Sequence, residues 1–225
     1  MTGHSIQAVI WDYGGVITTS PFEAFARFEC ERGLPDGLLR RVNAANHLDN
    51  AWARFERSQL DIDGFDQAFA AECAALGHSV RGRDVVAVLG GSIRPAMVEA
   101  LRRLRPRLKI GLITNNVRTT DPDGFDEGGR SEILTLFHHV IESAKAGVRK
   151  PDPAIYKMMC EALGVAPAQT VFLDDLGVNL KPARALGMHT IKVDDPDEAL
   201  QQLEALVGFA LRDGPATSAH SLSPV

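Results

Sequence analysis

Asp12 is the residue of this sequence best placed to carry out chemistry. It ends an apolar run over residues 6–11, and Gly14 and Gly15 follow it. A strand that stops at a carboxylate before two glycines presents that carboxylate at the carboxyl edge of a sheet, where the backbone can pass close to a ligand. There an aspartate can attack a phosphoryl group and form an aspartyl-phosphate. Taken alone, an aspartate after a strand is more often a turn or helix-cap residue.

Asp174 and Asp175 form a second acidic site at the end of another apolar run, residues 170–174. Adjacent carboxylates at a buried strand end repel each other unless a cation is bound. Mg²⁺ suits them, because this ion binds a few carboxylates together with a backbone carbonyl and waters. The alternative is a pair of N-cap residues for a helix that starts near Val178.

Thr114, Asn115 and Lys150 supply polar groups that could hold a phosphate. Thr114 ends the apolar run 108–114 and offers a hydroxyl and a backbone N–H, with Asn115 beside it. Lys150 precedes a proline in an extended stretch, and its charge could keep a phosphate and a carboxylate nucleophile from repelling each other. By themselves these residues are more simply a polar strand end and a solvated surface lysine.

Five apolar runs of strand length alternate with helical patterns. The predicted strands are residues 6–11, 108–114, 139–142, 170–174 and 190–193, and the predicted helices among them are 94–105, 153–163, 178–186 and 196–207. This alternation predicts an α/β fold, a Rossmann-like parallel sheet with helices on both faces. In the strand order 5-4-1-2-3 the first and fourth strands are neighbours, so Asp12 lies beside Asp174 and Asp175. Each of the four segments that contain these polar residues is a weak signal alone. Because all four are predicted at the same edge of one sheet, a functional role is favoured for each over a purely structural one.

The long connection after the first strand predicts a helical cap above the site. Nearly 80 residues separate Gly15 from the helix at 94–105, whereas a crossover needs about a dozen. Apolar residues at helical spacing predict cap helices at 22–32, 36–45, 50–58 and 65–76. We expect a core of residues 1–17 and 92–211, a cap of residues 18–91, a mobile loop at 116–130 and a disordered tail at 212–225.

Composition limits the class of protein and its partners. The chain has 225 residues, 45% of them apolar, which is enough for one substantial core and a smaller lobe. A net charge of -5, without a basic stretch rich in aromatics, argues against nucleic-acid binding. Three widely spaced cysteines without a CxxC pair favour a reduced, cytoplasmic setting. No apolar run reaches the length of a membrane span, so neither export nor a membrane partner is expected.

The sequence resembles the haloacid dehalogenase superfamily of phosphatases, in the subgroup with a helical cap after the first motif. Within it, the sequence resembles the N-terminal phosphatase domain of soluble epoxide hydrolase, and it also looks like the related domain fused to some acyl-CoA dehydrogenases. It is strongest over residues 138–208, notably in KPDPAIYK (150–157) and FLDDLGVNLKPAR (172–184). The resemblance implies hydrolysis of a small-molecule phosphomonoester through an aspartyl-phosphate. The roles it implies are Asp12 as nucleophile, Thr114 and Asn115 as phosphate ligands, and Lys150 as the charge clamp.

The same resemblance implies a Mg²⁺ cofactor. Its ligands would be Asp12, Asp175, the Gly14 carbonyl and, directly or through water, Asp174. Asn179 would hydrogen-bond behind these ligands.

One position departs from the pattern of this superfamily. The residue two positions after the nucleophile is usually an aspartate that acts as general acid and base, and here it is Gly14. This departure keeps open a weakly active or non-catalytic regulator that binds phosphate or a metabolite. A dehalogenase-type hydrolase is a further alternative, but such enzymes use no metal, so the pair Asp174–Asp175 argues against it. The physiological substrate and the oligomeric state stay open.

Overall fold

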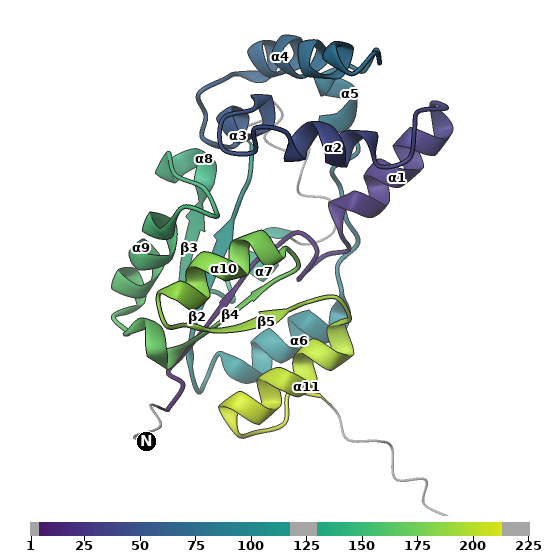
Figure 1. Cartoon of the computed structure of the whole chain (residues 1–225). Coiled ribbons are helices and arrows are strands. Elements are labelled where there is room, and N and C mark those ends of the chain that lie inside the picture. Colours follow the sequence, from purple (N-terminus) through teal and green to yellow (C-terminus); the bar gives the residue numbers. More distant parts are fainter. Residues whose placement is uncertain (1–4, 118–129, 213–225) are drawn as a thin grey trace, which may run out of the picture.

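The computed structural model describes residues 5–117 and 130–212, which contain a five-stranded parallel sheet with a helical cap above one edge (Figure 1). The strand order is β3-β2-β1-β4-β5, with β1 (Ala8–Trp11), β2 (Lys109–Thr114), β3 (His139–Glu142), β4 (Thr170–Asp174) and β5 (His189–Lys192). The predicted α/β class and strand order are confirmed, and each predicted strand ends within two residues of the observed one. Most of the expected loop and tail, residues 118–129 and 213–225, lies outside the described residues.

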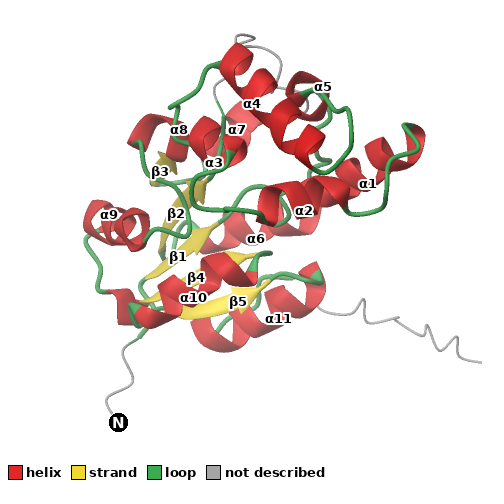
Figure 2. Ribbon diagram, turned by 45° about the horizontal axis from the view of Figure 1, so that its top comes forward, coloured by secondary structure: helices red, strands yellow, loops and turns green. Residues whose placement is uncertain are grey.

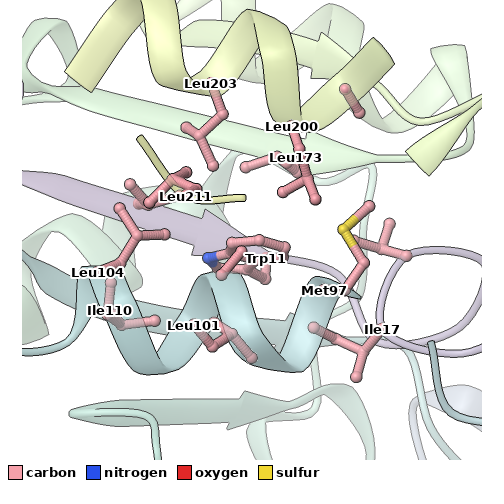
Figure 3. Close-up of a cluster of buried hydrophobic side chains, with 14 of the residues drawn as sticks. Trp11, Ile17, Met97, Leu101, Leu104, Ile110, Leu173, Leu200, Leu203 and Leu211 are labelled. Carbon is pink, nitrogen blue, oxygen red and sulfur yellow. The ribbon is translucent and has the colours of Figure 1, made fainter. Parts of the chain in front are cut away.

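Helices bury both faces of the sheet. One face packs against α6 (Pro95–Leu104) and α11 (Pro196–Val207), and the other against α9 (Pro153–Leu163) and α10 (Gly177–Ala185). Side chains of β1 alternate between the two hydrophobic clusters, with Val9 and Trp11 in the first and Ala8 and Ile10 in the second. Figure 3 shows Trp11 among leucines of α6 and α11. The unbroken apolar sequence of β1 is therefore explained by burial on both sides.

The register of the sheet places the ends of three strands side by side. Trp11 of β1 pairs with Leu112 of β2 on one side and with Leu173 of β4 on the other. Asp12 continues this ladder, because its backbone N–H donates to Leu173 O at 2.9 Å. The residues beyond these strand ends therefore meet at the carboxyl edge, where parallel sheets of this kind bind ligands.

The cap consists of helices inserted between β1 and α6 (Figure 2). They are α1 (Pro21–Glu31), α2 (Leu38–Ala44), α3 (Ala51–Glu56), α4 (Ile62–Ala75) and α5 (Gly82–Val86). Side chains of Ser20, Asn50 and Asp61 accept backbone N–H groups in the first turns of α1, α3 and α4, which explains where these helices begin. Helix α5 escapes the sequence prediction, since five residues that start with a glycine carry no readable helical period.

The cap has a hydrophobic cluster of its own. Phe25, Phe55, Phe65 and Phe69 are buried in it, and Trp52 makes edge-to-face contacts with three of these rings. The division of the chain into a core and a cap of residues 18–91 stays a prediction.

Two extended segments join the cap to the core. Thr18 and Ile93 form an antiparallel bridge, and the Thr19 N–H donates to Ser92 O at 2.9 Å. The remaining short elements are α7 (Arg130–Leu134), α8 (Ser143–Ala146) and a 3-10 helix (Pro167–Gln169). Within residues 5–117 and 130–212, no helix combines the length and the apolar character that a membrane crossing needs.

Candidate active site

Asp12, Lys150 and Asp174 form a buried row of charges at the carboxyl edge of the sheet. Lys150 Nζ lies 2.7 Å from Asp12 Oδ1 and 2.8 Å from Asp174 Oδ2. All three residues are nearly inaccessible, with 1% of Lys150, 0% of Asp174 and 8% of Asp12 exposed. Asp12 Oδ1 also accepts the backbone N–H of Tyr13 at 2.7 Å, which fixes the orientation of this carboxylate. The structure thus brings the predicted nucleophile, the predicted cation and one predicted metal ligand into contact.

Asp175 completes the acidic cluster, and Gly15 makes room for it. A Cβ atom at residue 15 would lie 2.2 Å from Asp175 Oδ2, and Gly15 has a φ of 78°. Both observations require glycine, because a side chain would clash with the carboxylate and other residues rarely adopt this φ. The same oxygen, Asp175 Oδ2, accepts a 3.4 Å hydrogen bond from Ser20 Oγ.

Burial and neighbouring charges shift the pKa values of these groups. Burial raises the pKa of Asp12 well above its usual range; Lys150 opposes this effect, and Asp174 adds to it. Burial acts against the charge of Lys150, but Asp12 and Asp174 outweigh it, so the pKa of Lys150 is raised. Burial, followed by the charge of Asp174, raises the pKa of Asp175 to about 6. The carboxylates therefore crowd one another, which favours binding of further positive charge.

The donor set of the site fits a magnesium ion. Asp12, Asp174 and Asp175 each offer a carboxylate oxygen, and these oxygens lie within 4.8 Å of one another. Once Lys150 is included, three carboxylates and one ammonium leave two uncompensated negative charges, which a divalent cation would balance. Hard oxygen donors of this kind suit Mg²⁺.

Asp174 is held in place from the start of α10. Its Oδ1 accepts the Leu176 N–H at 2.8 Å, and Asn179 Nδ2 donates to its two oxygens at 3.0 and 3.1 Å. Tyr156 Oη in turn donates to Asn179 O at 2.7 Å. Because Lys150 also donates to Oδ2, both oxygens of Asp174 already have protein donors. This arrangement favours contact with a metal through water over direct ligation by Asp174.

Thr114 and Asn115 stand at the end of β2. Thr114 is buried, with 5% of its surface exposed. The side chain of Asn115 is engaged with the backbone of Lys150: its Nδ2 donates to Lys150 O at 3.0 Å, and its Oδ1 accepts the Lys150 N–H at 2.9 Å. A phosphate contact from Asn115 would therefore come from its backbone N–H. The role of both residues as phosphate ligands stays a prediction.

Residues that the sequence analysis did not single out connect this site to the cap. Arg149, next to Lys150, pairs with Glu56 of α3, with 2.5 Å between Nε and Oε2. Ser143 Oγ donates to Glu56 O at 2.8 Å and accepts the Asn116 N–H at 3.0 Å. The available sequence signal was a charged residue, Glu56, directly after a buried phenylalanine in a short predicted helix.

The chain as a whole is similar to known proteins of one family. A model of haloacid dehalogenase-like hydrolases matches residues 6–187. The chain is 34% identical over 218 residues to acyl-CoA dehydrogenase family member 10 of Mus musculus, and the match covers 94% of the chain and 20% of that protein. It is 30% identical over 236 residues to bifunctional epoxide hydrolase 2 of Sus scrofa, which covers 98% of the chain and 42% of that protein. The chain thus spans less than half the length of either relative.

One relative of similar length and one solved structure add to this. The chain is 29% identical to phosphatase MT3486 of Mycobacterium tuberculosis, over 84% of the chain and 88% of that protein. The fold is similar to the crystal structure of the HAD family enzyme bt-2542 of Bacteroides thetaiotaomicron, at a TM-score of 0.57 and 20% identity. That likeness covers 84% of this chain and 94% of the other, and at such low identity it bears on the fold alone. Since the family model extends from β1 to beyond α10, the chain belongs to the haloacid dehalogenase-like hydrolases.

Proposed function

We propose that the protein is a Mg²⁺-dependent phosphatase that hydrolyses a small-molecule phosphomonoester through a phosphorylated Asp12. The observation that carries this proposal is the contact of Lys150 Nζ with Asp12 and Asp174 beside a third carboxylate, Asp175. A nucleophile, a cation next to it and a set of metal donors are the groups that phosphoryl transfer needs.

One relative by sequence supports this reaction, and one protein of the same fold is known with the proposed ion. The relative MT3486 bears the name phosphatase. The bt-2542 enzyme was crystallised in complex with magnesium and inorganic phosphate. The buried acidic cluster of the present chain offers donors for the same kind of ion.

The reaction would proceed in two displacements at phosphorus. In the first, an oxygen of Asp12 forms a bond to phosphorus, and the ester oxygen leaves with the bonding electron pair and takes a proton from water. Lys150 holds the Asp12 carboxylate in place and offsets the repulsion between it and the incoming phosphate. In the second, water attacks phosphorus and loses a proton to the solvent, and the P–O bond to Asp12 breaks, so that the carboxylate is regenerated and inorganic phosphate is released. Bound Mg²⁺ would supply charge that stabilises the phosphoryl oxygens in both steps.

A second function has one observation in its favour. Residue 14, where this superfamily usually carries the acid and base, is a glycine and has no side chain that could transfer a proton. A regulator that binds phosphate or a metabolite without efficient turnover would tolerate this loss. The acidic cluster argues for turnover, because a site for simple phosphate binding has no need of three carboxylates.

Phosphate release from an aryl phosphate by the purified protein separates the two functions. We expect turnover in Mg²⁺ that stops in excess chelator. Binding of phosphate without any turnover would favour the regulator, and full activity in chelator would contradict the proposed metal. Residence in the cytoplasm, a small-molecule substrate and the absence of nucleic acid as a partner also stay proposals, based on composition and on the buried site.

A further inference from the structure

Arg149 ties the segment that carries Lys150 to the cap. Its Nε lies 2.5 Å from Glu56 Oε2, and its Nη1 donates to His47 O at 3.0 Å. Both partners belong to the cap, since Glu56 ends α3 and His47 precedes it. The ion pair is largely shielded from water, with 18% of the Arg149 side chain and 9% of the Glu56 side chain exposed.

Glu56 is itself fixed by further contacts. Its Oε1 accepts the indole N–H of Trp52 at 2.9 Å, and Trp52 packs among the aromatic rings of the cap. Its backbone carbonyl accepts Ser143 Oγ at 2.8 Å, and the same hydroxyl accepts the Asn116 N–H. The position of Glu56 is therefore set jointly by the cap cluster and by the loop after β2.

Two neighbouring residues, Asn115 and Arg149, restrain the backbone of Lys150. Asn115, in the loop after β2, makes both of its side-chain hydrogen bonds to the N–H and C=O of Lys150. Arg149 precedes Lys150 directly, so one peptide bond joins the two backbones and they cannot move independently. The ammonium has little freedom to compensate, because it must stay 2.7 Å and 2.8 Å from two carboxylates.

We propose that Glu56 is a positioning residue that acts through Arg149 and aligns Lys150 with Asp12 only when the cap is docked on the core. The inference rests on the proposed phosphatase function and adds a cap residue to it. It explains why an ion pair is buried at a junction that apolar residues could fill at lower desolvation cost. A closed cap would thus complete the charge arrangement around the nucleophile.

The test compares the ion pair with a matched pair inside the cap. Asp66 of α4 accepts hydrogen bonds from Arg81 and from the Arg83 N–H, and it is 3% exposed. Figure 1 shows α4 on the side of the cap away from the sheet. Asp66→Asn therefore removes a buried carboxylate from an arginine without touching the Lys150 segment, and it controls for general loosening of the cap.

The variants Glu56→Gln, Arg149→Gln, their double variant and Asp66→Asn would be assayed with an aryl phosphate in Mg²⁺. Binding of inorganic phosphate would be measured by calorimetry and folding by melting temperature. A misplaced catalytic group costs up to about 100-fold, so we expect each single variant of the ion pair to lower kcat by about 10- to 100-fold. The double variant should be no slower than the slower single variant, because both changes break one connection. Asp66→Asn should stay within about 2-fold of the wild type at an equal loss of melting temperature.

Two results would overturn the inference: equal losses of kcat in Glu56→Gln and Asp66→Asn, or losses that multiply in the double variant. If Glu56→Gln does not fold, Arg149→Gln, which breaks the same ion pair from the core side, decides with the same expectation. If the wild type releases no phosphate, the proposed function fails separately. The inference is then decided by phosphate affinity, which Glu56→Gln should weaken and Asp66→Asn should not.

Discussion

Among the single residues of the site, Gly14 and Gly15 differ in whether the backbone requires a glycine at that position. Gly15 is required by space, because a Cβ atom there would overlap the Asp175 carboxylate. Gly14 is not: a Cβ atom at residue 14 would meet Pro21 Cγ at 3.4 Å, an ordinary contact. The missing acid at residue 14 is therefore a chemical difference that this backbone does not impose.

The replacement Gly14→Asp tests the consequence of this difference. A positioned general acid contributes about 10²–10⁴ in rate, most where the leaving oxygen is a poor one that must be protonated. We expect Gly14→Asp to raise kcat for alkyl phosphates more than for aryl phosphates, and the wild type to prefer aryl or acyl phosphates. Gly15→Ala is the control for adding a side chain at the neighbouring position, and it should lose activity because its Cβ atom would overlap the Asp175 carboxylate. If the wild type hydrolyses alkyl phosphates as fast as aryl ones, another proton donor is present.

At the scale of elements, β1 positions Asp12 by being buried on both faces. Its last residue, Trp11, is 0% exposed and packs with α6 and α11 (Figure 3). The indole N–H of Trp11 is buried and has no hydrogen-bond partner among the described residues. An unpaired buried donor of this kind costs about 1–3 kcal/mol, which offsets part of what the large ring contributes.

We therefore expect Trp11→Phe to be tolerated. Loss of the unpaired donor balances the loss of ring volume, so the free energy of unfolding should change by less than about 1.5 kcal/mol. Leu104→Ala, in the same cluster, leaves a cavity and should cost about 2–5 kcal/mol. Urea unfolding of both variants checks this. A cost for Trp11→Phe as large as that for Leu104→Ala would mean that the indole N–H has a partner, such as a buried water.

At the scale of the whole molecule, the sheet and its order could be predicted because unbroken apolar runs and long crossovers leave few topologies. The cap helices that begin after Ser20, Asn50 and Asp61 were also predictable, because their apolar residues recur at helical spacing. The Glu56–Arg149 contact was not, since no local pattern says which cap residue meets which loop of the core. Nor could the sequence reveal that the side chain of Asn115 makes its hydrogen bonds to the backbone of Lys150.

The acidic cluster also makes the stability of the whole fold depend on pH. The pKa of Asp175 rises from 3.8 to about 6 on folding, so the folded protein takes up a proton between these values. The stability contributed by this group is fully present below about pH 4 and is lost as the pH rises through about 6. In chelator, Asp175→Asn should therefore be more stable than the wild type at pH 7.5, on the order of 2 kcal/mol, and the difference should vanish near pH 4.

Magnesium should reverse that order. The ion binds the native wild type and raises its melting temperature, whereas Asp175→Asn should gain much less. Thermal melts of both proteins with Mg²⁺ and with chelator, at each pH, decide this. A wild type that is already the more stable protein in chelator at pH 7.5 would contradict the electrostatic account of the cluster.

Trapping the phosphoryl group on Asp12 is the decisive test of the proposed reaction. Without a side chain at residue 14 to activate water, the aspartyl-phosphate should break down slowly and accumulate during turnover. Acid quenching of the wild type with an aryl phosphate and Mg²⁺, followed by mass spectrometry, should find one phosphoryl group on the peptide that contains Asp12. The label should be absent in chelator and in Asp12→Asn, which should fold but not turn over. The proposed reaction would be contradicted if Asp12→Asn turned over as fast as the wild type and the Asp12 peptide of the wild type carried no phosphoryl group.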